Sequence, residues 1–311
     1  MIALGRAEVE ALLEPESLIA AVRSALLDVS AGSASMPTRI AAFSPSGLLA
    51  AMPAYLPSLG VLAAKLVAVF PGNATAPTHQ AVIVVFDPQD GTPLALLDGT
   101  VISAQRTAAA SALATLLLAR EDAAVLAIVG TGVQAESHAR YVATVRKFRE
   151  VRVAGRDPAR AQALAARLGA VAMPDIESAV RGADVICATT HAKEPLVRRG
   201  WLKAGAHVNS VGLHAEGSEL EASVLRDALL AVESRASAFA PPPAGAFDLR
   251  GLDAVAAVEL GELAAGTRAG RRSAEQITVY KGVGVAAEDA AAAALVLRLA
   301  KARGWGAPVR L

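Results

Sequence analysis

A glycine-rich turn joins a strand-like run to a helix-like run, and it constrains the fold of this chain more than any other feature. Residues 124–138 read AVLAIVGTGVQAESH. The first glycine permits a tight bend, the second lets the backbone approach a phosphate, and the later alanine allows close packing of helix on strand. Free N–H groups at a helix start attract phosphate oxygens. The pattern therefore predicts a dinucleotide-binding turn formed by Gly130, Thr131, Gly132, Val133 and Gln134.

Strand and helix patterns alternate after residue 120. Strands are expected at 124–129, 150–154, 170–173 and 183–189, with helices at 133–147, 158–168 and 175–181 between them. The series continues with strands near 206–211 and 228–232 and a helix near 219–226. This alternation predicts the α/β class, with a Rossmann-type, doubly wound parallel sheet.

Both ends of the chain are expected to build a second, α+β domain. The patterns predict helices over 7–30 and 103–119 and strands over 61–70, 80–87 and 92–98, whereas residues 34–57 are rich in Pro, Ser and Gly. A long Ala-rich helix over 286–302 is expected to pack back on this lobe. We therefore predict one domain of residues 1–119 with 284–311, and a dinucleotide-binding domain of residues 120–283.

Composition favours a small-molecule partner. The 311 residues include 30 basic and 29 acidic side chains, a net charge of +1, so no charged surface for nucleic acid or an anionic membrane is expected. Charges, Gly or Pro interrupt the apolar stretches, and the N-terminus lacks a secretory pattern, which predicts no membrane span and a cytoplasmic location. The five histidines lack paired metal-ligand spacing, so no metal site is expected.

The residues after the second strand of the dinucleotide unit bear on cofactor choice. The sequence there is Gly155-Arg156-Asp157, at a position where NAD-selective sites usually carry an acid for the ribose diol. A guanidinium pairs well with a 2′-phosphate. Arg156 therefore predicts a preference for NADP(H), and Asp157 leaves NAD(H) as the alternative.

Three cations separated in sequence are the candidate substrate-binding residues. Arg39 and Arg106 suit a carboxylate, because a guanidinium grips a planar carboxylate at two points. Lys65 lies in an apolar strand, where burial lowers the pKa of an ammonium group and lets it exchange a proton. We expect these residues to form an active site between the two lobes.

A series of motifs along nearly the whole chain resembles the ornithine cyclodeaminase/μ-crystallin family. Besides the VGTGVQAESH turn, they are Met36-Pro37-Thr38-Arg39, Met52-Pro53-Ala54-Tyr55, Lys65-Leu66-Val67, Pro77-Thr78-His79-Gln80, Leu97-Asp98-Gly99, Arg106-Thr107-Ala108-Ala109, Gly205-Ala206-His207-Val208-Asn209, Val211-Gly212, Glu219-Leu220 and Ile277-Thr278-Val279-Tyr280-Lys281. The resemblance implies a homodimer formed through the first lobe, which also binds substrate, and a Rossmann lobe that binds NAD(P).

The resemblance also implies roles for single residues. Arg39 and Arg106 would hold the substrate carboxylate, and Lys65 would lie by the reacting nitrogen. Cofactor contacts are implied for Thr78, Thr107, Val133, Gln134, Thr190, Val211 and Val283. The position before Val283 is usually serine in the family and is Gly282 here, so one side-chain contact is missing.

Two departures from the family pattern favour one reaction. Cyclodeaminases resemble each other in having an acid at the positions of Ala50 and His214, and an amine-cycling deaminase needs a carboxylate to accept a proton and steady a cationic intermediate. We therefore predict reduction of a cyclic imino acid, 1-pyrroline-2-carboxylate or 1-piperideine-2-carboxylate, to the L-amino acid. Ornithine cyclodeamination and non-catalytic binding of NADPH with a small ligand are the alternatives.

Three other polar residues have expected roles in this scheme. His214 is expected either as a second acid, since histidine side chains in general titrate near neutrality, or as a solvent-exposed loop residue. His79 is expected to orient backbone or the cofactor pocket. Asp289 is expected to be a helix-start cap.

Overall fold

The computed structural model describes residues 1–214 and 216–310 and divides by internal contacts into two units. Unit 1 is Met1–Arg106 with Gly284–Leu311, and unit 2 is Thr107–Val283. The second boundary is the one that the sequence predicts. The first lies earlier than the predicted residue 119, because helix α3 (Gly99–Leu118) runs through it without a break.

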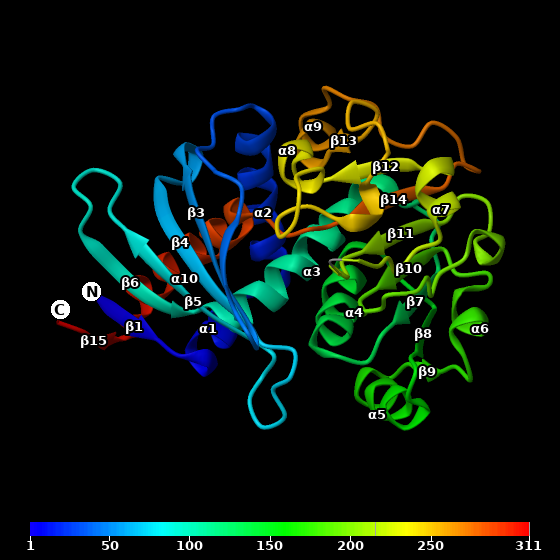
Figure 1. Ribbon diagram of the computed structural model, residues 1–311, viewed down its shortest axis with the longest axis horizontal. Helices are drawn as coiled ribbons and strands as arrows, with labels where there is room; N and C mark the ends of the chain where they lie inside the picture. Colours follow the sequence, from blue (N-terminus) through cyan, green and yellow to red (C-terminus); the bar gives the residue numbers. More distant parts are fainter. Residues whose placement is uncertain (215, 311) are drawn as a thin grey trace. The chain divides into compact units, whose positions relative to one another are not determined.

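Unit 2 is built on an all-parallel sheet in the order β13-β12-β14-β11-β10-β7-β8-β9 (Figure 1). Its strands are β7 (Val125–Val129), β8 (Glu150–Ala154), β9 (Val171–Ala172), β10 (Val185–Ala188), β11 (His207–Ser210), β12 (Leu229–Val232), β13 (Val258–Glu259) and β14 (Thr278–Lys281). The central strands β7 and β10 are buried along their whole length, as expected for a parallel sheet covered on both faces. The predicted Rossmann-type sheet is confirmed.

The helices of unit 2 follow the strands. They are α4 (Val133–Val145), α5 (Pro158–Leu168), α6 (Ile176–Val180), α7 (Ala222–Asp227), α8 (Arg235–Ala238) and α9 (Leu260–Ala265), with the 3-10 turns η2 (Arg199–Trp201) and η3 (Phe247–Leu249). The order β9-β8-β7-β10-β11-β14 reverses direction between β7 and β10. A dinucleotide binds across such a reversal point, outside the carboxyl ends of the strands.

Unit 1 is a mixed sheet with helices packed on one face. The sheet has the order β15-β1-β6-β5-β4-β3-β2 and is antiparallel except for the pair β1 and β6. Its elements are β1 (Ile2–Leu4), α1 (Arg6–Leu12), α2 (Pro15–Ser30), β2 (Ile40–Ser44), β3 (Gly47–Leu56), η1 (Pro57–Leu59), β4 (Val61–Val69), β5 (His79–Phe86), β6 (Pro93–Asp98), α10 (Ala286–Arg303) and β15 (Ala307–Pro308). Helix α10 packs against β3, β4, β5 and α2, so the C-terminal part of the chain completes this core.

One expectation about the N-terminal part was wrong, and one segment had no predicted structure. The helix predicted over 7–30 is two helices, because Pro15 begins α2 and its ring cannot continue α1. The Pro-, Ser- and Gly-rich segment 34–57 contains strands β2 and β3. Pairing of β3 with the next strand, β4, over nine residue pairs outweighs local composition here.

Helix α3 is long and apolar enough to cross a bilayer by length and composition alone. It contains a single charged residue, Arg106, so the expected interruption by charges is weak in this stretch. Of its most apolar window, 72% is buried inside the protein, as in the core helix of a globular unit.

Candidate active site

Two of the three predicted cations of unit 1, Lys65 and Arg106, contact two buried carboxylates. Lys65 Nζ lies 2.6 Å from Asp289 Oδ2. Arg106 reaches the same residue with Nε, 2.9 Å from Asp289 Oδ1, and its Nη1 lies 2.8 Å from Glu288 Oε2. All four side chains are nearly removed from solvent. Burial removes the hydration of a charged group, and this costs so much free energy that buried charges are retained only where they are paired.

Side chains alternate between the two faces of β4, and this alternation directs Lys65 toward the cluster. Lys65 pairs across the sheet with Met52 on β3 and Ile83 on β5, and all three are buried on the face that α10 covers. Glu288 and Asp289 lie in the first turn of α10. A helix N-terminus stabilises negative charge, so these carboxylates are well placed to receive the cations.

Gly284 brings the two arginines together. Its carbonyl oxygen accepts a hydrogen bond from Arg39 Nη2 at 2.9 Å. Its φ is +70°, and a Cβ there would meet Arg106 Nη1 at 2.5 Å. The residue must therefore be glycine, and half-buried Arg39 lies beside the buried cluster of Lys65 and Arg106 through Gly284.

The cluster gives Lys65 an unusual acidity. Burial lowers the pKa of Lys65 to about 8, and Arg106 adds to the effect, while Asp289 opposes it. Burial pushes the pKa of Asp289 upward, yet Arg106 and Lys65 together hold it below its ordinary value. Lys65 thus exchanges its proton near neutral pH beside a carboxylate that stays ionised.

The expectation that Asp289 is a helix cap was wrong. Its carboxylate is occupied by Lys65 and Arg106, and the N-terminal N–H of Val285 donates instead to Glu288 Oε2 at 3.2 Å. A sequence signal was available, since Glu288 and Asp289 are the only charges in an otherwise apolar stretch of Ala-rich helix. Two acids on a buried helix require cationic partners.

In unit 2, the predicted dinucleotide turn links β7 to α4. Gly130 has a φ of +129°, and a Cβ there would meet Thr189 Oγ1 at 2.6 Å. Gly132 is the residue before α4 and no side chain caps this helix. A Cβ on Gly132 would meet nothing within 4 Å, which leaves open space beside the first turn. These residues fit a pyrophosphate group on the helix N-terminus.

The two residues after β8 that bear on cofactor choice differ in their contacts and exposure. Asp157 Oδ1 accepts hydrogen bonds from the N–H groups of Ala159 and Arg160, at 3.0 and 3.2 Å, and so caps α5. Arg156 is exposed immediately before it. The acid is therefore engaged by its own helix while the guanidinium is accessible.

Other predicted cofactor residues follow the strands of the same sheet. Thr190, Val211 and Val283 lie within two residues of the ends of β10, β11 and β14, at the carboxyl edge where the turn of β7 also lies. Thr107 lies on α3. Thr78 belongs to unit 1, before β5, and its hydroxyl contacts exposed His79 Nδ1 at 3.3 Å.

His214 lies in the loop after β11 and is partly buried. Its ring centroid is 5.1 Å from that of His191, which follows β10. Burial and the neighbouring His214 lower the pKa of His191. Sequence reasoning did not find this pair, because the two residues come from different strand ends.

The sequence of this chain matches a known protein family over almost its whole length. The model of the "Ornithine cyclodeaminase/mu-crystallin family" matches residues 1–303. The chain belongs to this family. It is 42% identical to the ketimine reductase mu-crystallin of Mus musculus over 255 residues, which are 80% of each chain.

Two solved structures are also similar over nearly the whole length. The Δ1-pyrroline-2-carboxylate reductase of Thermococcus litoralis, in complex with NADH and L-proline, has a TM-score of 0.93 and 33% identity, covering 99% of this chain and 100% of that one. An archaeal alanine dehydrogenase dimer with bound NAD has a TM-score of 0.92 and 29% identity, covering 100% and 99%.

Proposed function

We propose that this chain reduces a cyclic imino acid, 1-pyrroline-2-carboxylate or 1-piperideine-2-carboxylate, to the L-amino acid with NAD(P)H. The observation that carries the proposal is buried Lys65, whose pKa of about 8 suits a proton donor near neutral pH. The names of the mouse and T. litoralis relatives, a ketimine reductase and a pyrroline-2-carboxylate reductase, support the same reaction.

Each residue of the cluster has a role in this reaction. Arg39 and Arg106 bind the substrate carboxylate and orient the imine, which supplies part of the rate enhancement through positioning. Lys65 donates its proton to the imine nitrogen and becomes neutral. Asp289 holds Lys65 in place and favours its protonated form before the transfer. When bound, NAD(P)H supplies the hydride that the imine carbon accepts.

The same cluster disfavours ornithine cyclodeamination. Ala50 lies on the buried face of β3, two residues from Met52 and therefore on the face that carries Lys65. An acid at this position would lie on the same face as Lys65, and Ala50 provides no carboxylate there. His214, in the loop after β11, stands at the position of the second acid, so the chain has no carboxylate there either.

Cofactor preference follows from the end of β8. Exposed Arg156 is available for a 2′-phosphate, whereas Asp157 is engaged as the cap of α5. We infer that NADP(H) is preferred, with NAD(H) also accepted. Arg156→Ala should raise the KM for NADPH by about tenfold and leave that for NADH within twofold, since a charged hydrogen bond is worth about 1.5–3 kcal/mol. Equal losses with both cofactors would refute the assignment.

The first experiment measures NADPH and NADH oxidation on addition of 1-piperideine-2-carboxylate. Oxidation by the wild-type protein that Lys65→Met reduces by at least about a hundredfold, a typical loss for a proton-transfer group, would support both the reaction and the donor. Wild-type turnover in Lys65→Met would exclude Lys65 as the donor. Ammonia release from ornithine with NAD would instead favour cyclodeamination, and binding without turnover would favour a binding protein.

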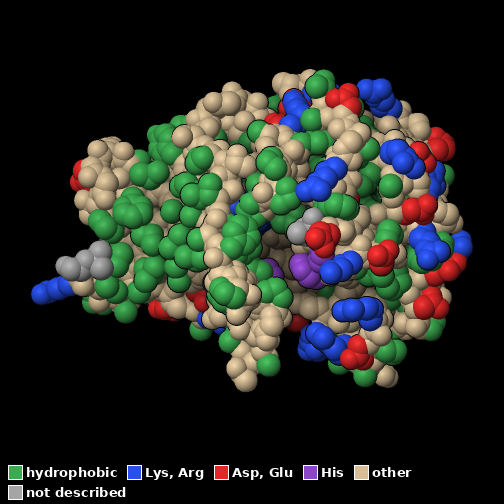
Figure 2. Space-filling view, viewed as in Figure 1, with side chains coloured by type: hydrophobic (Ala, Val, Ile, Leu, Met, Phe, Trp, Pro, Cys, Tyr) green, Lys and Arg blue, Asp and Glu red, His purple; other side chains and the backbone are tan. Residues whose placement is uncertain are grey.

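The outer face of the unit 1 sheet supports a homodimer. Ile40, Leu49, Leu66 and Val82 are 68%, 48%, 38% and 42% exposed, and strand register places all four on the face opposite α10. Figure 2 shows hydrophobic side chains gathered over these strands. An apolar patch of this kind marks an interaction surface, and we infer that a second copy of the chain covers it.

A further inference from the structure

Glu219 is a buried carboxylate to which the proposed reaction gives no role. It is 1% exposed and lies between α7 and the loop that follows β11. Oε1 accepts hydrogen bonds from Thr190 N at 2.5 Å and Thr190 Oγ1 at 2.7 Å. Oε2 accepts from Gly212 N at 2.7 Å and Ser210 Oγ at 3.0 Å. One side chain therefore ties the loop after β10 to the loop after β11.

Gly212 is held from both sides. Its N–H donates to Glu219, and its carbonyl oxygen accepts from Lys281 Nζ at 2.7 Å. A Cβ at this position would overlap the Glu219 carboxylate and the carbonyl oxygen of Thr190. The backbone of the loop after β11 is thus fixed in one place by two buried charges of opposite sign.

Lys281 extends the arrangement. It is 1% exposed at the end of β14, donates to Ser210 Oγ at 3.2 Å and pairs with Asp248 Oδ2 at 3.0 Å. Asp248 also accepts from Ser218 Oγ at 3.0 Å, next to Glu219 in the sequence. Burying charges is costly unless they are satisfied, and here Glu219 and Lys281 each make a hydrogen bond to loop backbone, while Asp248 neutralises Lys281 as an ion pair.

The location of the network gives it a functional meaning. In a doubly wound sheet the adenosine half of a dinucleotide lies over the first βαβ unit, here β7 and β8, and the other half lies across the reversal point, here over β10 and β11. We infer that Glu219 is a positioning residue that, with Lys281, holds the loops after β10 and β11 in the conformation that accepts the nicotinamide half. This inference rests on the proposed use of NAD(P)H.

The decisive substitution changes the hydrogen-bonding groups of Glu219 but not its size. Glu219→Gln keeps the size of the side chain but replaces one acceptor oxygen by an NH₂ donor. The hydroxyls of Thr190 and Ser210 can rotate to accept from it, whereas the N–H groups of Thr190 and Gly212 cannot. The new NH₂ group must therefore face the N–H group of either Thr190 or Gly212, so that one of the two loops loses its hydrogen bond and two donors oppose each other.

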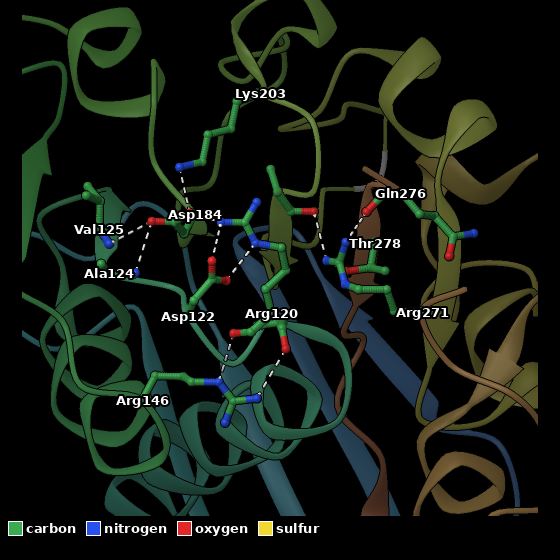
Figure 3. Close-up of polar contacts among 12 residues, drawn as sticks. Arg120, Asp122, Ala124, Val125, Arg146, Asp184, Lys203, Arg271, Gln276 and Thr278 are labelled. Carbon is green, nitrogen blue, oxygen red and sulfur yellow. Dashed lines mark hydrogen bonds and ion pairs between the residues drawn. The ribbon is translucent and has the colours of Figure 1, made fainter. Parts of the chain in front are cut away.

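Asp184 provides a matched control in the same unit. It is also a buried carboxylate, and its Oδ2 accepts from the N–H groups of Ala124 and Val125 at 3.0 Å each, while Oδ1 lies 2.6 Å from Lys203 Nζ (Figure 3). It precedes β10 and contacts the start of β7, so it lies at the amino edge of the sheet, opposite the cofactor turn. Asp184→Asn should lower stability without changing dinucleotide binding.

The test compares a dinucleotide with its nicotinamide-free fragment. Calorimetry measures the dissociation constants of four ligands separately: NADPH and its fragment 2′-phospho-ADP-ribose, and NADH and its fragment ADP-ribose. The melting temperature of each variant is measured as well. We expect Glu219→Gln to weaken binding of the preferred dinucleotide by about tenfold and to leave its fragment within twofold. Asp184→Asn should leave both within twofold. Ser210→Ala removes one bond to Glu219 and one from Lys281 but leaves both backbone anchors of Glu219 in place. It is the milder variant should Glu219→Gln fail to fold, and we expect from it a smaller loss that is selective for the dinucleotide.

Other outcomes separate the two proposals. Unchanged dinucleotide binding in Glu219→Gln, or an equal loss for dinucleotide and fragment, would overturn the positioning role alone. Equal losses in Glu219→Gln and Asp184→Asn would assign Glu219 to stability only. A wild-type protein that binds neither dinucleotide would overturn the proposed function and this inference together.

Discussion

At the scale of single residues, the function depends on how a lysine is kept both buried and protonatable. Burial alone lowers the pKa of an ammonium group, because the charged form loses its hydration. Asp289 opposes this effect at 2.6 Å, and the balance leaves the pKa of Lys65 at about 8. Asp289 is itself held ionised by Arg106 and Lys65. The acidity of the proposed proton donor thus depends on a partner from another element.

The pH dependence of activity tests this balance. If Lys65 is the proton donor, its protonated form is the active one, and kcat/KM should be constant well below its pKa of about 8, fall to half at that pH and continue to fall above it. Asp289→Asn removes the interaction that raises this pKa, so the fall should begin at lower pH. Glu288→Gln is the matched control, since Glu288 pairs with Arg106 and not with Lys65. A pH profile that Asp289→Asn leaves in place would contradict the role of Asp289.

At the scale of elements, the turn between β7 and α4 uses its two glycines for different reasons. Gly130 is required by the fold, because its φ is positive and Thr189 occupies the space of a Cβ. Gly132 has extended backbone angles that any residue adopts, and open space beside it. Its lack of a side chain leaves the first turn of α4 accessible to a phosphate.

Alanine substitutions should separate these roles. Gly130→Ala should lower the free energy of unfolding by about 2 kcal/mol, the typical cost of a strained backbone position. Gly132→Ala should leave the unfolding free energy within about 0.5 kcal/mol, as for most surface substitutions, yet raise the Kd for NADPH and NADH. Urea unfolding and calorimetric titration measure the two quantities. A Gly132→Ala protein that binds both cofactors like the wild type would contradict phosphate binding at this turn.

At the scale of the whole molecule, the exposed apolar face of the unit 1 sheet is the feature that a monomer does not explain. Leu66 and Val82 pair directly across β4 and β5 on this face. A sheet face left uncovered would expose contiguous apolar surface, which single chains avoid. The homodimer proposed above covers it with a second copy.

Leu66→Glu should therefore convert a dimer to a monomer, measured by sedimentation, since a buried unpaired carboxylate at an interface is strongly unfavourable. Val171→Glu, at a similarly exposed apolar residue of β9 in unit 2, is the control and should leave the oligomeric state unchanged. A wild-type protein that sediments as a monomer would refute the dimer.

Much of unit 2 was predictable because its determinants are local. The strand, turn and helix around Gly130, the strand β8 and the helix α5 each arise from residues close in sequence, and the predicted bounds agree within two residues. Alternation of such units leaves a parallel, doubly wound sheet as the consistent arrangement. The sequence by itself therefore determined the fold class, the dinucleotide turn and the three candidate cations.

Tertiary structure decided the features that depend on distant partners. Strands β2 and β3 form in a segment of loop-like composition because β4 pairs with it. Asp289 is an ion-pair partner and not a helix cap because Arg106, 183 residues away, meets it in the core. Glu219 acquires its role from loops that follow two different strands. Local patterns specify elements, whereas the partner of a buried charge is specified only when the chain has folded and brought distant residues together.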